Sequence, residues 1–341
     1  MSIGGAVEDP DYQLSGVEGA TLLPDGRLII ADHYAEGLRA YAPDGTHLMT
    51  VGGEGEGPGE YEYIRGLGRC DAARIVAFDL HWSQNIYAQG LTWIEERSAE
   101  LPGLGSLGTP YQLACEPGGH LIATGWGDLG SQFQEGYYVA SAPVVLVRGG
   151  ALIHHFGERL SSERVGTFGN TGPHPFGRQT NVGISAERVF IGDASDYSIE
   201  VYDLTGRRIG DIEWTGPDRE IVDDDYDEHA RQVLERISEE RRPGMRRYLG
   251  ELPHLETFPA YDRLRVDTGG SLWVRSFPRP GADTVEWRVF EADGRELAIV
   301  ALPANGTLLD VTDDRIVYVE RDELDLETVH VAPLARRPPP R

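Results

Sequence analysis

The feature that most constrains this sequence is a pattern of short strands and Asp-Gly turns that recurs along nearly the whole chain. The segment GATLLPDGRLIIADHYAEGLRAYAPDGTHLMTVGG, which begins at Gly19, reads as four short strands. Asp25-Gly26 and Asp44-Gly45 supply the positive φ angles that tight hairpin turns require. A chain that repeats this unit must bury the unit's faces against its neighbours.

Six units follow when the sequence is aligned on the apolar residue two positions after each turn glycine. The units begin near Glu18, Arg65, Tyr111, Thr180, Asp262 and Thr307. The intervals between these residues are 47, 46, 69, 82 and 45, so three match a common period and two contain insertions. Six units of four strands predict an all-β, six-bladed β-propeller.

The repeat predicts one domain over residues 1–335, followed by a disordered tail at 336–341. The last unit ends after its third strand, near Val331. We expect the N-terminal segment Tyr12-Gln13-Leu14 to supply the missing outer strand, because pairing the two ends closes the ring and removes exposed sheet edges.

The insertions are predicted at about residues 125–137, 158–178 and 215–256, all on the face opposite the Asp-Gly turns. Apolar residues from Ile221 to Ile237 recur at helical spacing, which indicates an amphipathic helix between blades 4 and 5. Pro243-Gly244 is expected to end it, and a second short helix is expected to follow. Structural cover, a lid over a ligand site and a dimer contact remain open as roles; a monomer is the expected state.

Composition excludes some partners. The formal net charge of −25 argues against nucleic acid and anionic membranes, and no apolar run is long enough to span a bilayer. Cys70 and Cys115 are the only cysteines; we expect buried thiols, with a single bridge as the alternative. The start of the chain lacks a signal pattern, which leaves either a cytoplasmic protein or one whose export signal is missing from this sequence.

The first residue of each unit is expected at the mouth of the central channel. These residues are Glu18, Arg65, Tyr111, Thr180 with Asn181 beside it, Asp262 and Thr307. His33 and His81 follow second strands on the same face, where a histidine beside a carboxylate can act as a general base. Trp82 and Trp126 could form an apolar ligand wall or pack between blades. Asp32, Asp79 and Asp193 recur at one blade position, which indicates that they hold loops.

Two resemblances bear on these residues. The linker GEGEGPGEY resembles the linkers of NHL-like six-bladed propellers of bacteria, which supports the fold. EGATLLPDGRLIIAD from Glu18 and DRLRVDTGGSLWV from Asp262 look like blade segments of gluconolactonase/paraoxonase-type hydrolases. That resemblance implies a divalent cation, usually Ca²⁺, held by Glu18, Asn181 and Asp262. The sequence departs from the pattern because NVGIS is one residue short and Arg65 brings a cation into the channel.

Three functions remain open at this stage. The favoured hypothesis is binding of a small molecule or peptide at the top of the channel. The first alternative is a metal-dependent lactonase or esterase, in which the cation polarises a carbonyl. The second is a metal-free cyclase or lyase that uses channel acid and base groups, Glu18, Arg65 and Asp262 among them, under a helical lid.

Overall fold

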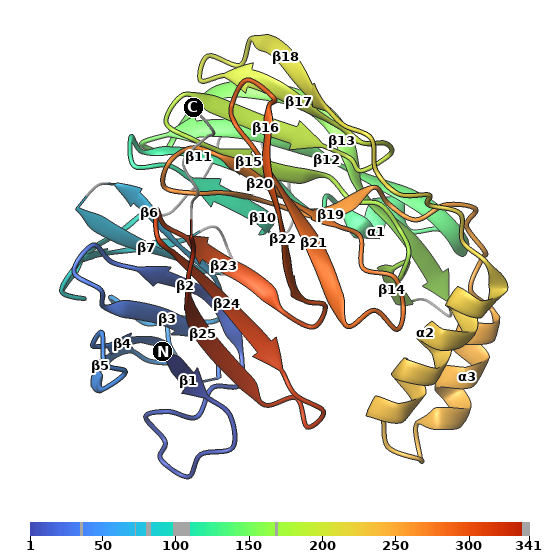
Figure 1. Ribbon diagram of the computed structural model, residues 1–341, viewed down its shortest axis with the longest axis horizontal. Helices are drawn as coiled ribbons and strands as arrows, with labels where there is room; N and C mark the ends of the chain where they lie inside the picture. Colours follow the sequence, from blue (N-terminus) through green and yellow to red (C-terminus); the bar gives the residue numbers. More distant parts are fainter. Residues whose placement is uncertain (35–36, 72, 80–82, 98–109, 168–169, 336–341) are drawn as a thin grey trace.

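The computed structural model confirms the predicted six-bladed propeller. Six antiparallel sheets form a ring, and the first strand of each sheet is innermost (Figure 1). The structure describes residues 1–34, 37–71, 73–79, 83–97, 110–167 and 170–335.

Four sheets follow the chain in simple order, each with four neighbouring strands. The first two contain β2 (Val17–Leu22), β3 (Leu28–Asp32), β4 (Gly37–Tyr41) and β5 (His47–Gly52), then β6 (Ile64–Asp71), β7 (Arg74–Asp79), β8 (Gln84–Ala88) and β9 (Trp93–Arg97). The other two contain β15 (Asn181–Ile184), β16 (Arg188–Gly192), β17 (Ser198–Asp203) and β18 (Arg208–Glu213), then β19 (Tyr261–Val266), β20 (Leu272–Ser276), β21 (Thr284–Phe290) and β22 (Glu296–Pro303).

The strand run Leu28-Ile29-Ile30-Ala31 shows why these sequences form blades. Leu28 and Ile30 belong to the apolar cluster shared with the closing blade, whereas Ile29 and Ala31 belong to the cluster shared with the second blade. Alternate side chains leave opposite faces of a strand. A blade with neighbours on both sides is therefore apolar on both faces, which explains the continuous apolar run.

The closing blade joins the two ends of the chain, but through a different segment from the one predicted. It contains β23 (Thr307–Val311), β24 (Arg315–Arg321), β25 (Glu327–Pro333) and the outer strand β1 (Ser2–Gly4). The expectation that Tyr12-Gln13-Leu14 forms this strand is wrong. Leu14 is buried in the core, and the Tyr12 hydroxyl accepts a hydrogen bond from the His47 backbone N–H at 3.0 Å, so this segment braces the first blade.

The third blade has five strands because the expected insertion at 158–178 continues the sheet. It contains β10 (Pro110–Cys115), β11 (His120–Gly125), β12 (Gly136–Arg148), β13 (Ala151–Thr167) and β14 (Asn170–Pro173). Between the end of β11 at Gly125 and the start of β12 at Gly136 lies the short helix α1 (Leu129–Gln132). The predicted insertion at 158–178 is largely β13 and β14, which lengthen this blade beyond its neighbours (Figure 1).

The longest insertion forms α2 (Asp223–Arg236) and α3 (Arg242–Gly250), between β18 and β19. Counted from the blade of β2–β5, this connection joins the fourth and fifth blades. Pro243 lies in the first turn of α3 rather than ending the first helix, a position where its missing N–H costs nothing. Among the described residues no helix is both long and apolar enough to cross a bilayer.

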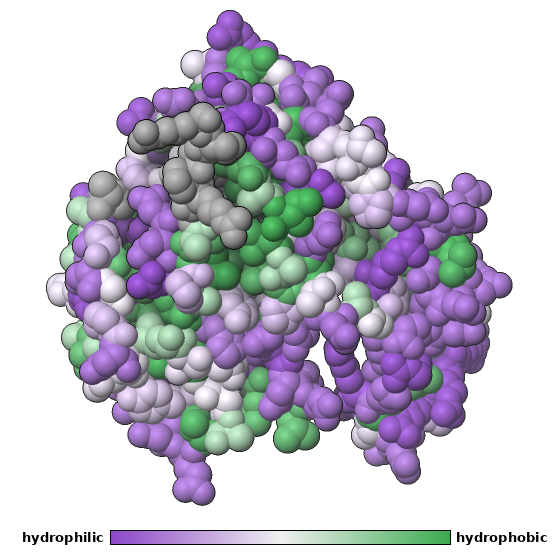
Figure 2. All heavy atoms as spheres, in the orientation of Figure 1, coloured by the Kyte–Doolittle hydropathy of each residue, from purple (hydrophilic) through white to green (hydrophobic). Residues whose placement is uncertain are grey.

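The two helices lie side by side at the rim of the molecule, away from β2, β6 and β23 (Figure 1). Figure 2 shows a largely hydrophilic surface on this hairpin. α2 packs on Phe176, whose ring centroid lies 4.8 Å from that of Tyr226 and 5.3 Å from that of His229. This position does not support the lid hypothesis, because no residue of the insertion lines the channel cavity described below.

Candidate ligand-binding site in the central channel

The residues predicted at the channel mouth occupy a special backbone position. The register of the innermost strand shifts at Glu18 in β2, Arg65 in β6, Tyr111 in β10 and Asp262 in β19. Such β-bulges re-aim a side chain relative to the regular ladder. In β15 the pairing Asn181–Gly192 is regular, which is the structural consequence of the short NVGIS motif.

A cavity of about 1170 Å³ runs through the ring and is lined by residues of all six innermost strands. We call the end where these strands begin the upper end and the end where they finish the lower end. Of the predicted residues, Glu18, Arg65, Tyr111 and Trp126 line the cavity. Thr180, Asn181, Asp262 and Thr307 are not among the lining residues, and His81 and Trp82 lie outside the described part of the chain.

The glycine-rich crossover from the first blade to the second ends at this upper end. Tyr61 is buried, and its hydroxyl oxygen lies 2.6 Å from that of Tyr87, so Tyr61 anchors the crossover. Tyr63 stacks on His33 with ring centroids 3.6 Å apart. Arg65 follows, with its guanidinium carbon 4.3 Å from the centre of the Tyr63 ring.

Glu18 is the acidic group of this upper cluster. Burial raises the pKa of its carboxyl, and the nearby charges of Arg65 and His33 oppose that shift without cancelling it. The Tyr63 hydroxyl donates to Glu18 Oε1 at 3.5 Å. Glu18 is thus a partly desolvated carboxyl beside a cation, an arrangement that can exchange a proton or respond to a bound charge.

Four arginines line the cavity: Arg65, Arg69, Arg263 and Arg265. Arg65 and Arg263 have no carboxylate within salt-bridge distance among the described residues. Arg265 donates through Nε to the Leu308 carbonyl at 3.2 Å. Burial, and then the charge of Arg263, lower its pKa to about 10, so it stays protonated at neutral pH.

These arginines stand on both sides of the channel. Around the closed ring the innermost strands follow the order β2, β6, β10, β15, β19 and β23. Arg65 and Arg69 lie on β6, and Arg263 and Arg265 lie on β19, three blades away. Arg69, Arg263 and Arg265 were missed from the sequence because only the first position of each unit was considered. Arg69 follows Arg65, and Arg265 follows Arg263, by an even number of residues. Residues at even spacing lie on the same face of a strand, so this spacing could have identified the missed arginines as cavity residues.

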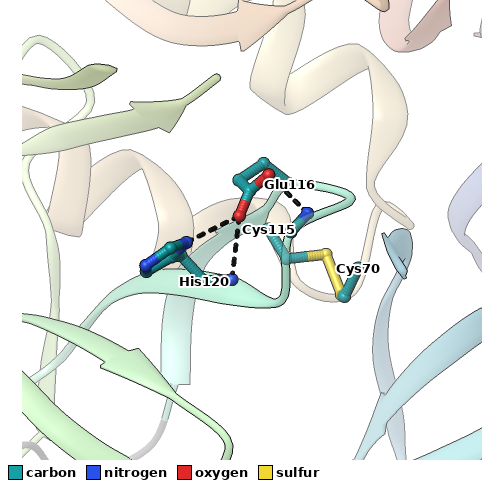
Figure 3. Close-up of a disulfide and its surroundings, with 5 residues drawn as sticks. Cys70, Cys115, Glu116 and His120 are labelled. Atoms are coloured by element: carbon teal, nitrogen blue, oxygen red, sulfur yellow. Dashed lines mark hydrogen bonds and ion pairs between the residues drawn. A yellow bond between two sulfur atoms is a disulfide. The ribbon is translucent and has the colours of Figure 1, made fainter. Parts of the chain in front are cut away.

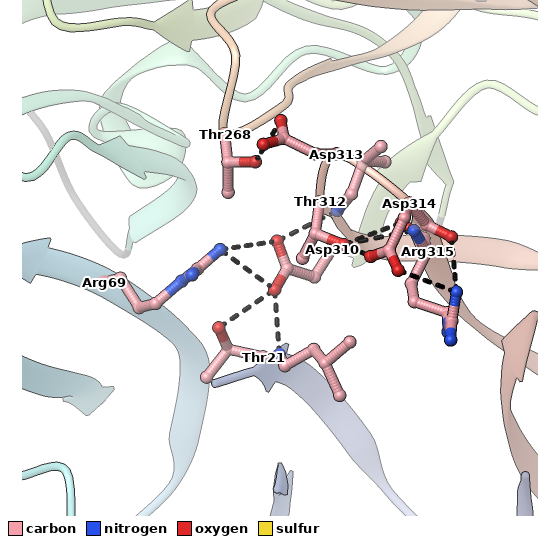
Figure 4. Close-up of polar contacts among 10 residues, drawn as sticks. Thr21, Arg69, Thr268, Asp310, Thr312, Asp313, Asp314 and Arg315 are labelled. Atoms are coloured by element: carbon pink, nitrogen blue, oxygen red, sulfur yellow. Dashed lines mark hydrogen bonds and ion pairs between the residues drawn. The ribbon is translucent and has the colours of Figure 1, made fainter. Parts of the chain in front are cut away.

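Asp310 ties three blades together near the lower end (Figure 4). Its Oδ2 accepts hydrogen bonds from the Thr21 hydroxyl at 3.0 Å and the Leu22 backbone N–H at 2.9 Å. Arg69 donates to the same carboxylate at 3.3 and 3.4 Å. Asp310 belongs to β23, Thr21 and Leu22 to β2, and Arg69 to β6, so the carboxylate is fully engaged within the ring.

Cys70 and Cys115 form a disulfide between the innermost strands β6 and β10 (Figure 3). The expectation of buried free thiols is therefore wrong, and the alternative of a single bridge holds. The two residues lie near the lower ends of neighbouring first strands, which brings their side chains together across the blade boundary. Beside the bridge, Glu116 accepts hydrogen bonds from the backbone N–H of His120 at 3.0 Å and pairs with its ring at 2.7 Å.

The structure does not bring the three predicted calcium ligands together on the cavity wall. Glu18 faces the cavity, but Asn181 is fully buried and donates its amide to the Gln179 carbonyl at 3.0 Å. Asp262 forms an ion pair with Arg275 at 3.0 Å, and burial raises the pKa of its carboxyl. Among the described residues no three His, Cys, Asp or Glu side chains gather around one point. Three carboxylate or amide ligands would have to converge to hold Ca²⁺.

The remaining predicted residues have packing or loop roles. The Thr180 carbonyl accepts the Tyr111 hydroxyl at 2.7 Å, and Thr307 begins β23 outside the cavity. Asp79 accepts hydrogen bonds from the backbone of Glu62 at 3.0 Å and Tyr63 at 2.7 Å. Asp193 accepts the Ser195 N–H at 3.0 Å, and Asp32 lies 3.9 Å from Arg39. These contacts agree with the expectation that the recurring aspartates hold loops.

Comparison with known proteins adds the fold alone. No family model matches the sequence, and no curated protein matches it. A solved structure from Bacteroides fragilis covers 98% of this chain and 95% of its own, at 14% identity and a TM-score of 0.53. A gluconolactonase from Xanthomonas campestris covers 94% and 87%, at 13% identity and a TM-score of 0.48. A calcium-binding regucalcin from Agrobacterium tumefaciens covers 94% and 90%, at 11% identity and a TM-score of 0.46. Likeness at these identities bears on the fold, and a fold by itself does not choose a function.

Proposed function

We propose that this protein binds a small anionic molecule, or an acidic peptide, at the upper end of the central channel. The observation that carries the proposal is the pair Arg65 and Arg263, on opposite sides of one cavity and without a carboxylate partner among the described residues. Arg65 is partly buried, and a partly desolvated cation is costly when unpaired. Arg263 is exposed and adds a second cation to the lining of the same cavity. An anionic ligand would remove that cost and gain two charge-assisted contacts.

The overall charge strengthens the argument. The chain carries a formal charge of −25, so its surface repels anions and would not collect them by accident. The carboxylates near the lower end of the cavity are distant from Arg65 or already occupied. Asp310 is occupied by Thr21, Leu22 and Arg69, Asp267 accepts hydrogen bonds from Ser271 and Trp273, and Glu187 follows the lower end of β15. Glu116 is likewise occupied by its own turn. The unpaired charge that remains at the upper end is mainly cationic, and Glu18 only partly offsets it.

Binding can be tested with simple anions at low ionic strength, sulfate and succinate, by titration calorimetry. We expect Arg65→Gln and Arg263→Gln each to weaken binding about tenfold, since a hydrogen-bonded charged contact contributes about 1.5–3 kcal/mol. Arg207→Gln is the matched control, because Arg207 lies on an outer turn with a side chain 78% exposed. If neither anion binds, or the control weakens binding equally, the proposal is wrong.

A metal-free acid–base reaction is the second candidate function. It rests on Glu18, whose pKa burial raises and which accepts the Tyr63 hydroxyl in the same cavity. A carboxyl with a raised pKa can accept a proton from a bound substrate and return it. Turnover of a bound anion that Glu18→Gln abolishes without loss of binding would favour this reaction over binding alone. Binding without turnover would favour the first function.

A further inference from the structure

A buried histidine links the helical hairpin of α2 and α3 to the third blade. His174 directly follows β14 and is only 3% exposed. Its Nδ1 accepts a hydrogen bond from the Phe176 backbone N–H at 3.1 Å. Its Nε2 lies 2.8 Å from the carbonyl oxygen of Pro253, in the segment that follows α3. Because a carbonyl oxygen can only accept, Nε2 carries the hydrogen and the ring is neutral.

The hairpin makes few other firm contacts with the propeller. No residue of α2 or α3 is buried, and the rings of Tyr226 and His229 pack on Phe176, beside the end of β14 (Figure 1). Arg279, from the connection between β20 and β21, donates to the Asp218 carbonyl ahead of α2 at 2.8 Å. An element with few buried contacts opens at a lower free energy than the core does. Loss of one contact can therefore release the hairpin while the propeller stays folded.

The surroundings of His174 disfavour a proton on its ring. Burial lowers the pKa of the ring, which its hydrogen bond to the carbonyl and the charge of Glu163 oppose without cancelling the shift. Glu163 of β13 is already engaged, because its carboxylate accepts the Arg178 backbone N–H at 2.7 Å and pairs with the Arg178 guanidinium. His229 of α2 and His254, which lies between α3 and β19, lower the pKa further.

Protonation would place a hydrogen on both ring nitrogens. Nδ1–H would then face the N–H of Phe176 with no acceptor between them, and the ring would become a buried charge. We propose that His174 makes the docking of the hairpin sensitive to pH: the neutral ring holds the hairpin on the propeller, and protonation of the ring releases it. Release would not depend on anion binding in the channel, since the contact lies at the rim of the molecule.

Hydrogen–deuterium exchange of the full chain between pH 7.5 and 4.5, corrected for the intrinsic pH dependence of amide exchange, tests this proposal. A solvated histidine has a pKa near 6.5, so at pH 5.5 the released ring is protonated about ten times more often than it is neutral. The protection of the α2 and α3 amides should therefore fall about tenfold from pH 7.5 to pH 5.5. At every pH these amides should be less protected than those of β20, which is the mark of local opening.

His174→Asn removes the titrating ring and keeps the turn, because an Asn side-chain oxygen can accept the N–H two residues on. Most of the pH dependence of the α2 and α3 amides should disappear in this variant. His155→Gln is the matched control. The His155 Nδ1 accepts the N–H of Gly157, also two residues on, at 2.9 Å, but this contact is exposed to water. The control should keep the tenfold fall.

His229→Gln separates His174 from the other histidine that packs on Phe176, whose pKa burial also lowers. This variant should keep most of the fall in protection. The proposal is wrong if the unaltered protein shows no fall, or if the hairpin and β20 are equally protected. It is also wrong if His229→Gln removes the fall, because the titrating ring is then His229. A His174→Asn protein that fails to fold leaves the decision to the unaltered protein and His229→Gln.

Discussion

At the lower end of the channel Asp310 and the two cysteines link neighbouring blades, whereas at the upper end Arg65 and Arg263 line the cavity without a carboxylate at salt-bridge distance among the described residues. Asp310 joins β23 to β2 and β6, and the disulfide joins β6 to β10. Within the described part of the chain, Arg65 and Arg263 make no comparable link between blades. The difference teaches that the two ends of the innermost strands differ in kind: their ends link the blades of the ring, and under the proposed function their beginnings would offer charge to a ligand.

The largest expected change in the free energy of unfolding comes from breaking the disulfide. The two cysteines are 45 residues apart in the sequence. For a loop of that length the loop-entropy model gives about 4 kcal/mol of stabilisation of the folded state. We expect a reductant to lower the free energy of unfolding by that amount, measured by urea denaturation. The chain has only two cysteines, so the reductant has no other target.

If the two ends are independent, the reduced protein should keep its affinity for sulfate within about twofold in the absence of urea. The double variant Cys70→Ser, Cys115→Ser should behave like the reduced protein and be indifferent to reductant. A parallel loss of stability and of sulfate affinity would contradict the separation of the two ends.

Removal of the Asp310 carboxylate should have the next largest effect. Asp310→Ala deprives Arg69, Thr21 and Leu22 of their shared acceptor, which should cost about 2 kcal/mol of unfolding free energy. Asp314→Ala is the control on the same blade, because the Asp314 side chain is 70% exposed and pairs only at the surface with Arg315. Its cost should stay below about 0.5 kcal/mol. Equal costs for the two variants would show that Asp310 is not a special link.

The sequence predicted the repeat, the six blades and, to within one residue, the start of each innermost strand, because turn glycines and apolar runs follow local rules. It did not predict which of these residues reach the cavity. Glu18, Arg65 and Tyr111 do, whereas Asp262 turns to Arg275 on the neighbouring strand. Whether Asp262 reaches the cavity depends on this tertiary ion pair, which the sequence does not show. The absence of a bulge at Asn181 likewise depends on the length of the NVGIS motif, which is one residue short. The disulfide was left as the weaker alternative because cysteines 45 residues apart meet only once adjacent blades are placed.

The smallest expected effect concerns Glu18 and follows from its raised pKa. Between the ordinary value near 4.5 and the raised value in the folded protein, the folded state holds a proton that the unfolded state has lost. Stability contributed by Glu18 is therefore lost as pH rises through that window. Glu18→Gln should be more stable than the unaltered protein at pH 7, and the difference should disappear below about pH 4.5. Urea denaturation across pH 4 to 8 measures this.

The same proton should couple the Glu18 carboxyl to the arginines. When Glu18 is protonated, Arg65 loses the nearest opposing charge, so affinity for sulfate should rise as pH falls through the raised pKa. In Glu18→Gln the sulfate affinity should be flat over this range and equal to the low-pH affinity of the unaltered protein. Glu239→Gln, at a side chain 92% exposed, should leave the pH dependence unchanged. A pH-independent sulfate affinity in the unaltered protein would show that Glu18 and Arg65 do not act on the same bound charge.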